Sequence, residues 1–303
     1  MNQRALITGA SGYIGTQLCQ RLLDEGWHVD VLFREAGRPI VQSIASRITP
    51  HIYDGSTQSV QTAVAEARPD IVFHLASLFI AEHRSDQITD LINSNLLFGT
   101  QLAEACVRTG VQHFINTGTS WQHYRSDAYD PVCLYAATKQ AFEDILDFYT
   151  DAFPMRAITL KLFDTYGPDD PRPKLINLLI KAMNTGDALG MSPGEQTVDL
   201  VHVNDVTRAF SHCAQLLIDG RTTQRHERYA VSSGVSISVR QLVALLELVS
   251  GKAISVTYGA RQYRDREVMT LWQHGQHPPG WHAEIDIHTG LTFMLHQQVE
   301  PSP

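Results

Sequence analysis

Tyr135 and Lys139, in the segment YAATK, have the residue types and the spacing of an acid–base pair. On a helix, side chains four residues apart lie on one face, one turn from each other. A phenol has an ordinary pKa of about 10 and exchanges protons poorly near neutral pH. A neighbouring ammonium and an oxidised nicotinamide ring both favour the phenolate, so we expect the pKa of Tyr135 to be lowered. The pair indicates proton exchange with a substrate oxygen.

Hydroxyl groups that can share this oxygen precede the pair, in the segment NTGTS at 116–120. We expect Thr119 to hydrogen-bond the oxygen that Tyr135 protonates. Ser120 and then Thr117 are the alternatives. Taken alone, Tyr-x-x-x-Lys is more typical of a half-buried tyrosine beside a lysine whose stem packs on it. The order of motifs along the chain, with a glycine turn first, a hydroxyl next and the pair last, favours catalysis.

The glycine turn is TGASGYIG at 8–15, between a short apolar run and a helical pattern. Gly9 permits a sharp exit from a strand, Gly12 lets a pyrophosphate approach the helix start, and Gly15 lets the helix pack closely on a sheet. The alternative is a helix cap with incidental glycines, which this spacing disfavours. The sequence therefore predicts a dinucleotide site. The residues expected to contact the cofactor here are Gly9, Ser11, Gly12, Tyr13, Ile14 and Gly15.

Arg34 bears on which dinucleotide is bound. An NAD site commonly has an acidic residue at the end of the second strand, which accepts from the ribose hydroxyls. Here the strand pattern HVDVLF is followed by Arg34, and Asp30 lies in its middle. A guanidinium suits a 2′-phosphate, with Arg38 as a second contact. We therefore favour NADP, and NAD remains the alternative if Arg34 is a solvated loop residue.

Short apolar runs alternate with helical patterns through the first half of the 303 residues. The runs ALIT, IVFHLA and AITLKLF are typical of parallel strands buried on both faces. They predict an α/β fold with a Rossmann-type doubly wound parallel sheet over residues 1–165. A loop rich in Gly, Pro and Asp follows, and mixed helix and strand patterns then predict a smaller mixed C-terminal substrate lobe over 166–298. We expect some later segments to return to the main sheet, and 299–303 to be a tail.

Charge and composition exclude some classes of function. Lys and Arg total 24 against 32 Asp and Glu, and a net charge of −8 argues against nucleic-acid or anionic-membrane binding driven by positive charge. The absence of a long apolar run predicts no transmembrane helix. The start of the chain lacks the apolar run of a secretory signal and the four cysteines form no Cys-x-x-Cys, so we expect a cytoplasmic protein. His274, His277 and His282 lack ligand partners at metal-site spacing, which predicts no metal.

The chain resembles the extended short-chain dehydrogenases/reductases, in the NAD-dependent epimerase/dehydratase family and its branch that acts on nucleotide sugars. Besides the glycine turn, the Thr119 region and YAATK, the motifs are HLAS at 74–77, Asn95 with Gly99-Thr100, LFDTYGP at 162–168, VDLVHVNDV at 198–206 and YGARQYRDREVM at 258–269. They extend over essentially the whole chain. A short loop between the hydroxyl and the tyrosine, and the GA-x-x-x-R-D-x-E-x-M stretch, most resemble CDP-abequose/CDP-paratose synthase-like 4-ketoreductases.

The resemblance implies further cofactor contacts and a homodimer. We expect Lys139 to hold the nicotinamide ribose, and Asp54 to accept from the adenine amino group unless it is only a turn residue. The full set of further cofactor contacts is Asp54, Gly55, Leu75, Ala76, Ser77, Asn95, Thr117, Tyr135, Lys139, Leu162 and Phe163. The helices at about 86–109 and 132–152 are implied to pair with their symmetry mates in a four-helix bundle.

Three departures from family patterns restrict the reactions and the substrate contacts that we expect. Dehydratases of this branch have Asp-Glu after the catalytic threonine, but Ser120-Trp121 stands here, so loss of water has no evident catalyst. Asp164 replaces an asparagine that contacts substrate, and a carboxylate cannot donate as an amide does. Val198 replaces an arginine, so one expected diphosphate partner is missing.

Cations for a nucleotide diphosphate come late in the chain. Arg261 and Arg264 are candidates because a guanidinium binds phosphate with two hydrogen bonds. The alternative is a solvated strand edge whose arginines pair with Asp265 and Glu267. By resemblance, Lys174 and Asn177 also contact the nucleotide, unless they are only a polar helix start. The expected substrate set is Thr119, Ser120, Asp164, Lys174, Asn177, Arg261 and Arg264.

Together these features predict an NADPH-dependent reductase of a nucleotide-linked 4-keto-6-deoxysugar. Hydride reaches C4, Tyr135 gives a proton to O4, and Thr119 polarises that oxygen. The alternative is a nucleotide-sugar 4-epimerase with tightly bound NAD(P). A sensor that binds NADP without chemistry is disfavoured, because such proteins usually lose the tyrosine or the lysine, and both are present.

Overall fold

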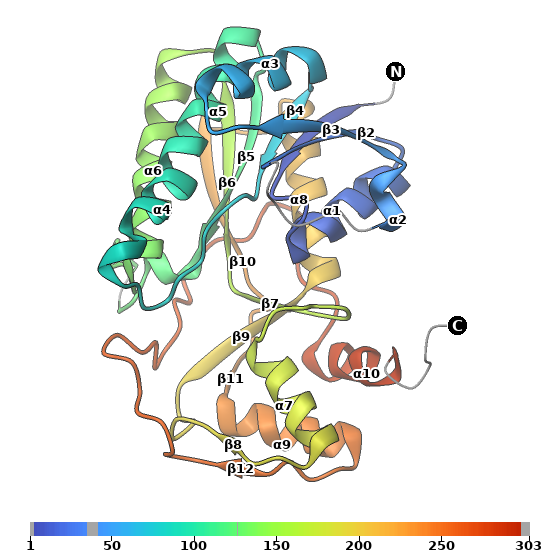
Figure 1. Ribbon diagram of the computed structural model, residues 1–303, viewed down its shortest axis with the longest axis vertical. Helices are drawn as coiled ribbons and strands as arrows, with labels where there is room; N and C mark the ends of the chain where they lie inside the picture. Colours follow the sequence, from blue (N-terminus) through green and yellow to red (C-terminus); the bar gives the residue numbers. More distant parts are fainter. Residues whose placement is uncertain (1–2, 35–41, 126, 298–303) are drawn as a thin grey trace.

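The computed structural model describes residues 3–34, 42–125 and 127–297, and its larger lobe is built around one parallel sheet (Figure 1). Seven described strands form this sheet in the order β10-β6-β5-β4-β1-β2-β3, with every neighbouring pair parallel. The strands are β1 (Arg4–Thr8), β2 (His28–Arg34), β3 (Ile48–Tyr53), β4 (Ile71–His74), β5 (His113–Thr119), β6 (Arg156–Leu162) and β10 (His226–Val231). They confirm the predicted Rossmann-type sheet.

The strand order reverses between β1 and β4, which lie side by side although β2 and β3 separate them in the sequence. Every residue of β4 is buried, and β1 is buried from Ala5 onward, because helices cover both faces of the sheet. In such sheets ligands bind at this reversal, outside the carboxyl ends of the strands. The fold therefore points to the ends of β1 and β4 at Thr8 and His74.

The helices of the larger lobe cover the sheet in two groups (Figure 1). On one face α1 (Tyr13–Asp24) packs on α8 (Val203–Ile218), and on the other α5 (Phe98–Thr109) packs between α3 (Thr57–Ala67) and α6 (Leu134–Ala152). Each group buries an apolar cluster against its face of the sheet. No helix in the described part of the chain has the length and apolarity needed to cross a membrane.

A wider turn interrupts the helical segment before β5. The 3-10 helix η1 (Ser85–Gln87) and α4 (Ile88–Ile92) lead into a π-helical turn at Asn93–Leu97, labelled η2, which continues into α5. The helix expected over about 86–109 is therefore present, with an irregularity that hydrophobic periodicity does not reveal. Such π turns are frequent at functional sites, and this one carries Asn95.

The smaller lobe is a mixed structure with its own apolar cluster. Strand β9 (Thr197–His202) pairs parallel with β7 (Asp164–Tyr166) and antiparallel with β11 (Ser236–Ser238). The remaining elements are the parallel pair β8 (Leu189–Gly190) and β12 (Val256–Thr257), with α7 (Leu175–Thr185), α9 (Val239–Ser250) and α10 (Ile287–Gln297). This lobe confirms the prediction of a smaller mixed unit beside the main sheet.

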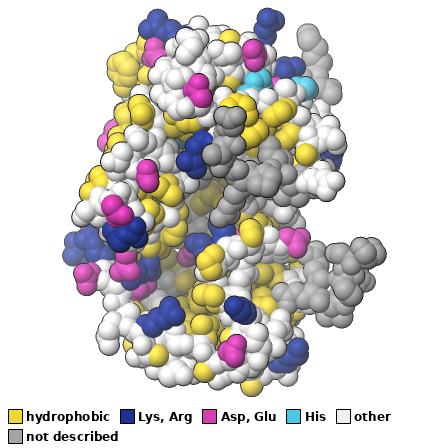
Figure 2. Space-filling view, viewed as in Figure 1, with side chains coloured by type: hydrophobic (Ala, Val, Ile, Leu, Met, Phe, Trp, Pro, Cys, Tyr) yellow, Lys and Arg dark blue, Asp and Glu magenta, His cyan; other side chains and the backbone are white. Residues whose placement is uncertain are grey.

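The chain passes between the lobes more than once. Helix α8 and strand β10 follow β9 in the sequence but belong to the larger lobe, where β10 pairs with β6 at the edge of the sheet. Short α2 (Gln42–Ala45) lies beside α1. The surface is hollowed between the lobes, and basic and hydrophobic side chains surround the hollow (Figure 2).

Candidate active site

The glycine turn sits against the end of β4, and its geometry demands glycine. Gly9 has a φ of +76°, and a Cβ there would lie 2.6 Å from the Ala76 backbone nitrogen. A Cβ on Gly15 would lie 2.1 Å from the Gly9 carbonyl oxygen. Gly12 begins α1, and within the described residues no side chain caps this helix start. Free N–H groups and the helix dipole remain available to an anion, as a dinucleotide pyrophosphate requires.

Thr8 and His74 join the ends of β1 and β4. The Thr8 Oγ1 lies 2.8 Å from His74 Nδ1 and accepts a hydrogen bond of 3.2 Å from the Ala76 nitrogen. Burial, together with the nearby Lys139 charge, lowers the pKa of His74 to about 3. The imidazole is therefore neutral, and it fixes the strand end on which the cofactor segment at 75–77 begins.

Asn95, from the π turn, organises that segment. Its Oδ1 accepts from the Leu78 nitrogen at 2.7 Å and from the Ser77 hydroxyl at 3.1 Å. Its Nδ2 donates to the Leu78 carbonyl at 3.0 Å and to Thr138 Oγ1 on α6 at 3.1 Å. The amide is fully used by the protein, so its effect on a cofactor is to position Ser77 beside α6.

Tyr135 and Lys139 lie buried in the first turns of α6. The Lys139 Nζ is 5.9 Å from the centroid of the Tyr135 ring, and across the described chain it makes no hydrogen bond or ion pair. Burial lowers the pKa of Lys139 to about 8, while Glu143 acts in the opposite direction. An ammonium in this position is available to the hydroxyls of a ribose.

In the chain without a nicotinamide, the pKa of Tyr135 is shifted in the direction opposite to the lowering expected with one bound. Burial raises that pKa to about 12, and the hydrogen bond with Ser77 offsets this only in part. The loss of water around the phenolate outweighs attraction from the neighbouring ammonium. Tyr135 is consequently held in its protonated form, which is the form that gives a proton to a substrate oxygen.

Thr119 is the last residue of β5 and caps the short 3-10 helix η3 (Ser120–Gln122). Its Oγ1 accepts from the Trp121 nitrogen at 3.3 Å, and its own nitrogen donates to Gln122 Oε1 at 3.0 Å. Thr119 and Ser120 are both buried, and the Thr117 hydroxyl is buried without a hydrogen-bond partner in the described structure. All three hydroxyls named from the sequence lie at the carboxyl end of the sheet.

Two aromatic residues that the sequence analysis did not assign to the site stand beside the tyrosine. The Phe79 ring is 5.0 Å from the Tyr135 ring in a T-shaped contact and 5.5 Å from the Trp121 ring. The Lys174 Nζ lies 4.9 Å from the centroid of Phe79, and the Arg264 guanidinium lies 5.1 Å from that of Trp121. These contacts bring two of the expected substrate cations, which come from the smaller lobe and a late loop, to the predicted proton donor.

The other residues expected to bind substrate differ in whether their polar groups are already paired within the protein. Asp164 pairs with Lys174 at 3.7 Å. Arg264 makes a two-bond ion pair with Glu267, which is the alternative considered for this segment. Asn177 donates to the carbonyls of residues 170 and 172, so its amide holds the loop before α7. Arg261 is exposed, and its backbone nitrogen donates to the Met191 carbonyl.

At the adenosine side, Arg34 is exposed at the end of β2, opposite Tyr53 in β3. Asp30 is buried in ion pairs with Arg4 and His51, at 3.1 and 2.8 Å, and does not reach the strand end. Arg38 lies outside the described residues. Asp54, ahead of Gly55, accepts from the Ser56 nitrogen at 2.8 Å, as a turn aspartate does.

The remaining residues that the sequence predicts to contact the cofactor lie at strand ends or on α1. Leu162, at the end of β6, is in register with Thr119, and Phe163 follows it with its ring stacked 6.2 Å from Trp272. The Tyr13 phenol donates to the Pro168 carbonyl, so this side chain ties α1 to the loop after β7. Among the described residues no group of three or more His, Cys, Asp or Glu side chains is placed to hold a metal ion.

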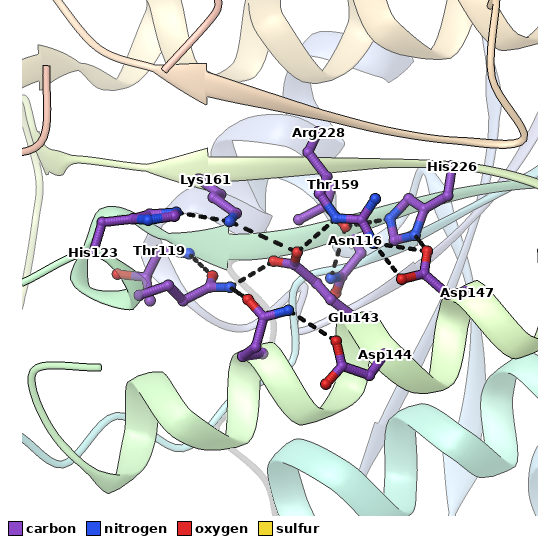
Figure 3. A network of polar contacts seen from close by, with 12 residues as sticks. Asn116, Thr119, His123, Glu143, Asp144, Asp147, Thr159, Lys161, His226 and Arg228 are labelled. Atoms are coloured by element: carbon purple, nitrogen blue, oxygen red, sulfur yellow. Dashed lines mark hydrogen bonds and ion pairs between the residues drawn. The ribbon is translucent and has the colours of Figure 1, made fainter. Parts of the chain in front are cut away.

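A buried polar network lies one turn beyond Lys139 on α6 (Figure 3). Glu143 is fully buried and accepts from Gln122 Nε2 at 2.8 Å and from Arg228 Nε at 3.1 Å, with Lys161 Nζ at 3.8 Å. Through Gln122 the network reaches the backbone of Thr119. It therefore connects α6 and η3 with β6 and β10.

The network continues to Asp147, another turn along α6. The two carboxylate oxygens of Asp147 accept from Arg228 Nη2, at 2.7 Å for Oδ1 and 2.6 Å for Oδ2. Oδ1 also accepts from His226 Nδ1 at 2.8 Å. His226 Nε2 lies 2.8 Å from Thr159 Oγ1, which accepts from Asn116 Nδ2 at 3.1 Å. The hydrogen bond with His226, more than any other contact, lowers the pKa of Asp147 to about 2.

Comparison with known proteins supports both the fold and the motifs. The family model described as "NAD dependent epimerase/dehydratase family" matches residues 5–225. A CDP-abequose synthase from Salmonella muenchen is 25% identical, covering 97% of this chain and 98% of its own. A UDP-glucose 4-epimerase from Mycolicibacterium smegmatis is 27% identical, covering 79% of this chain and 80% of its own. These matches confirm the resemblance drawn from the motifs.

A solved structure has the same fold. MoeE5 in complex with UDP-glucose and NAD superposes with a TM-score of 0.84 at 24% identity, covering 98% of each chain. The agreement extends over both lobes, so the arrangement of sheet, helices and smaller lobe is shared over nearly the whole length.

Proposed function

Because the chain belongs to the NAD dependent epimerase/dehydratase family, we propose that it is an NADPH-dependent reductase of a nucleotide-linked 4-keto-6-deoxysugar. The observation that carries the proposal is the buried pair on α6, a protonated phenol beside an ammonium without an ion-pair partner in the described structure. A nicotinamide, when bound, supplies the hydride that reaches C4. The protein residues supply the proton, the polarisation of O4 and the position of both reactants.

The residues present fit a dinucleotide. The glycine turn and the uncapped start of α1 form a cradle for the pyrophosphate. The Lys139 ammonium has donors free for the nicotinamide ribose, and Asn95 holds Ser77 beside α6, the helix that carries Lys139. Arg34 at the end of β2 supports NADP, because the nearby carboxylate of Asp30 is committed to ion pairs.

Proton transfer is assigned to Tyr135, with Thr119 as its partner at O4. Burial keeps the phenol protonated, and hydride addition makes O4 a strong base, so the proton moves from the phenol to O4. The Lys139 ammonium then stabilises the phenolate. Ser120 and Trp121, where dehydratases have an acid–base pair, support reduction over loss of water.

A 4-epimerase with tightly bound NAD(P) is the second candidate, and the match to a UDP-glucose 4-epimerase favours it. An epimerase carries its dinucleotide through purification and shows no net cofactor turnover. A reductase is isolated largely free of it and consumes one NADPH for each ketone reduced. The cofactor content of the purified protein and the absorbance of NADPH during turnover distinguish the two.

The substrate is tested in two steps. Thermal unfolding is measured with NADPH and CDP-, dTDP-, GDP- or UDP-linked sugars, because specific binding stabilises the folded chain. The best nucleotide is then supplied as its 4-keto-6-deoxyhexose, and we expect NADPH oxidation. An unchanged unfolding temperature with all four nucleotides, or binding without NADPH oxidation, contradicts the proposal.

We also propose a homodimer formed through α4, α5 and α6. Large apolar side chains are exposed on α4, on the π turn that leads into α5, and on α6: Ile88, Ile92, Leu97 and Phe148. Burial of such side chains against a symmetry mate is favourable. Sedimentation should give twice the chain mass, and Phe148→Glu should give monomers. A monomeric unmodified protein at micromolar concentration contradicts the dimer.

A further inference from the structure

Phe79 is an apolar side chain placed where burial does not account for it. It lies in the segment between β4 and η1, and 47% of its surface is exposed. Its ring contacts Tyr135, the predicted proton donor, in a T-shaped arrangement. An exposed aromatic ring next to a reacting group is a common feature of ligand sites, where the ligand covers it.

Trp121 extends this ring into a continuous apolar wall. Its ring centroid is 5.5 Å from that of Phe79, and the indole takes the place after Thr119 and Ser120 where dehydratases have a glutamate. The two side chains offer a substrate one polar atom, the Trp121 Nε1. A hydroxyl that packed against the ring carbons would lose water and find no acceptor.

The cations at the far side of the wall fix the direction in which a sugar lies. The Lys174 ammonium lies over the Phe79 ring and the Arg264 guanidinium over the Trp121 ring, and the Tyr135 ring meets Phe79 in a T-shaped contact. A nucleotide sugar has its diphosphate on C1 and its reacting group at C4. With the diphosphate at these cations, where it would compete with Asp164 for Lys174 and with Glu267 for Arg264, and with C4 at Tyr135, the pyranose ring extends along the wall.

We propose that Phe79 and Trp121 receive a deoxygenated edge of the sugar and make the site selective for deoxysugars over their hydroxylated counterparts. This inference rests on the proposed function, because it takes the same pair of reacting groups and the same diphosphate position. The wall provides favourable contact to a methyl or methylene group. It provides no hydrogen-bond partner for a hydroxyl group. The deoxysugar therefore gains an apolar contact, and the hydroxylated sugar loses a hydrogen bond to water.

The test compares a nucleotide-linked 6-deoxyhexose with the matching hexose, both oxidised at C4 by NADP⁺ in the reverse direction. The nucleotide is the one that raises the unfolding temperature most. We expect kcat/KM to favour the deoxysugar by roughly tenfold to a hundredfold. Phe79→Asn and Trp121→Gln should bring this ratio towards one, mainly by improving the relative use of the hexose.

Phe293→Asn is the matched control. Phe293 is exposed to nearly the same extent, 46%, but lies on α10 in the smaller lobe. A merely structural effect lowers kcat/KM for both sugars alike and leaves the ratio unchanged, as we expect for the control. If Phe79→Asn keeps its turnover and its ratio of kcat/KM for the two sugars is unchanged, the proposed role of Phe79 in selectivity is wrong.

Calorimetric titration of the same two nucleotide sugars in the presence of NADP⁺ separates this inference from the proposed function. If the protein binds the deoxysugar more tightly and Phe79→Asn removes that preference, the selectivity inference is supported even where no C4 oxidation occurs. That result would reject the reaction alone. Equal affinity of the unmodified protein for the two sugars overturns the wall whatever the turnover.

Discussion

Both halves of α6 carry titratable side chains on one face, but only those of the second half form ion pairs between described residues. The side chains recur at four-residue steps and are Tyr135, Lys139, Glu143 and Asp147. In the first half the phenol and the ammonium are buried with no ion pair between described residues. In the second half the carboxylates are saturated by Arg228, Lys161 and His226 (Figure 3). Burial alone therefore does not distinguish the half to which we assign the chemistry, whereas the lack of ion-pair partners does.

The difference has an energetic reason. A buried charge that lacks a partner destabilises the fold, whereas a paired one is roughly neutral. Lys139 carries that cost and Glu143 does not, and the proposed function gives the reason, because it requires Lys139 to keep its donors free for a cofactor. Gln122 connects the two halves, since it binds the Glu143 carboxylate and the Thr119 backbone at once.

Loss of the Tyr135 phenol should give the largest effect in the first half. We expect Tyr135→Phe to lower kcat for NADPH oxidation by about 10²–10⁴-fold, because no other group gives the proton to O4. The free energy of unfolding should change little, since the ring and its contact with Phe79 remain. The comparison breaks if urea unfolding shows a large loss of stability or if turnover persists at the original rate.

Loss of the Glu143 charge should have the opposite signature. Glu143→Leu leaves Arg228 and Lys161 without their shared buried partner, so we expect stability to fall by about 3–5 kcal/mol. Urea unfolding monitored by circular dichroism measures this. Gln140→Ala on the same helix is the control: Gln140 contacts the network only at its edge, through Gln122, and is partly exposed, so its loss should cost far less. A Glu143 variant as stable as the control would show that the network is not structural.

The stability of the folded chain should depend on pH through Lys139, and the sign of this dependence distinguishes Lys139 from an ion-paired lysine. Its pKa is about 8 in the folded chain and about 10.4 when unfolded. Between these values the unfolded state binds more protons, so the stability of the protein without cofactor should rise with pH by up to about 1.4 kcal/mol per unit. Lys139→Met should lack this rise. A lysine held by an unrecognised carboxylate would have a folded pKa above about 10.4, so its stabilising contribution would be constant below about pH 10.4 and would be lost as the pH rose from there to the folded pKa.

Asp147 should show the smallest effect, because its side chain is 44% exposed. Its folded pKa, about 2, is below the unfolded value of about 3.9. Its contribution is therefore present above about pH 4 and is lost as the pH falls towards 2. Acid unfolding of Asp147→Asn should be flatter than that of the unmodified protein across this window. Parallel acid profiles would remove Asp147 from the stabilising half.

Local patterns in the sequence predicted the parts of the site that local structure determines. The glycine turn, Thr119 at a strand end and the Tyr135–Lys139 pair all depend on spacing within one strand, turn or helix. The parallel sheet followed from apolar runs for the same reason. These predictions need no knowledge of which distant segments meet.

Contacts between distant segments could not be predicted in this way. Phe79 and Trp121 meet because β4 and β5 are neighbours, and no periodicity in either loop marks them. Arg228 reaches Glu143 because β10 returns to the sheet beside β6. The raised pKa of Tyr135 in the chain without a nicotinamide could not be predicted either, because the depth of burial is a property of the assembled fold.

The most direct test of the central claim follows the hydride. The protein is incubated with NADPH deuterated at nicotinamide C4, on the face that it transfers, and with the nucleotide-linked 4-keto-6-deoxyhexose. The account predicts one deuterium at C4 of a single product epimer and one NADP⁺ formed for each sugar. Interconversion of C4 epimers without deuterium incorporation or net NADP⁺ formation would contradict it.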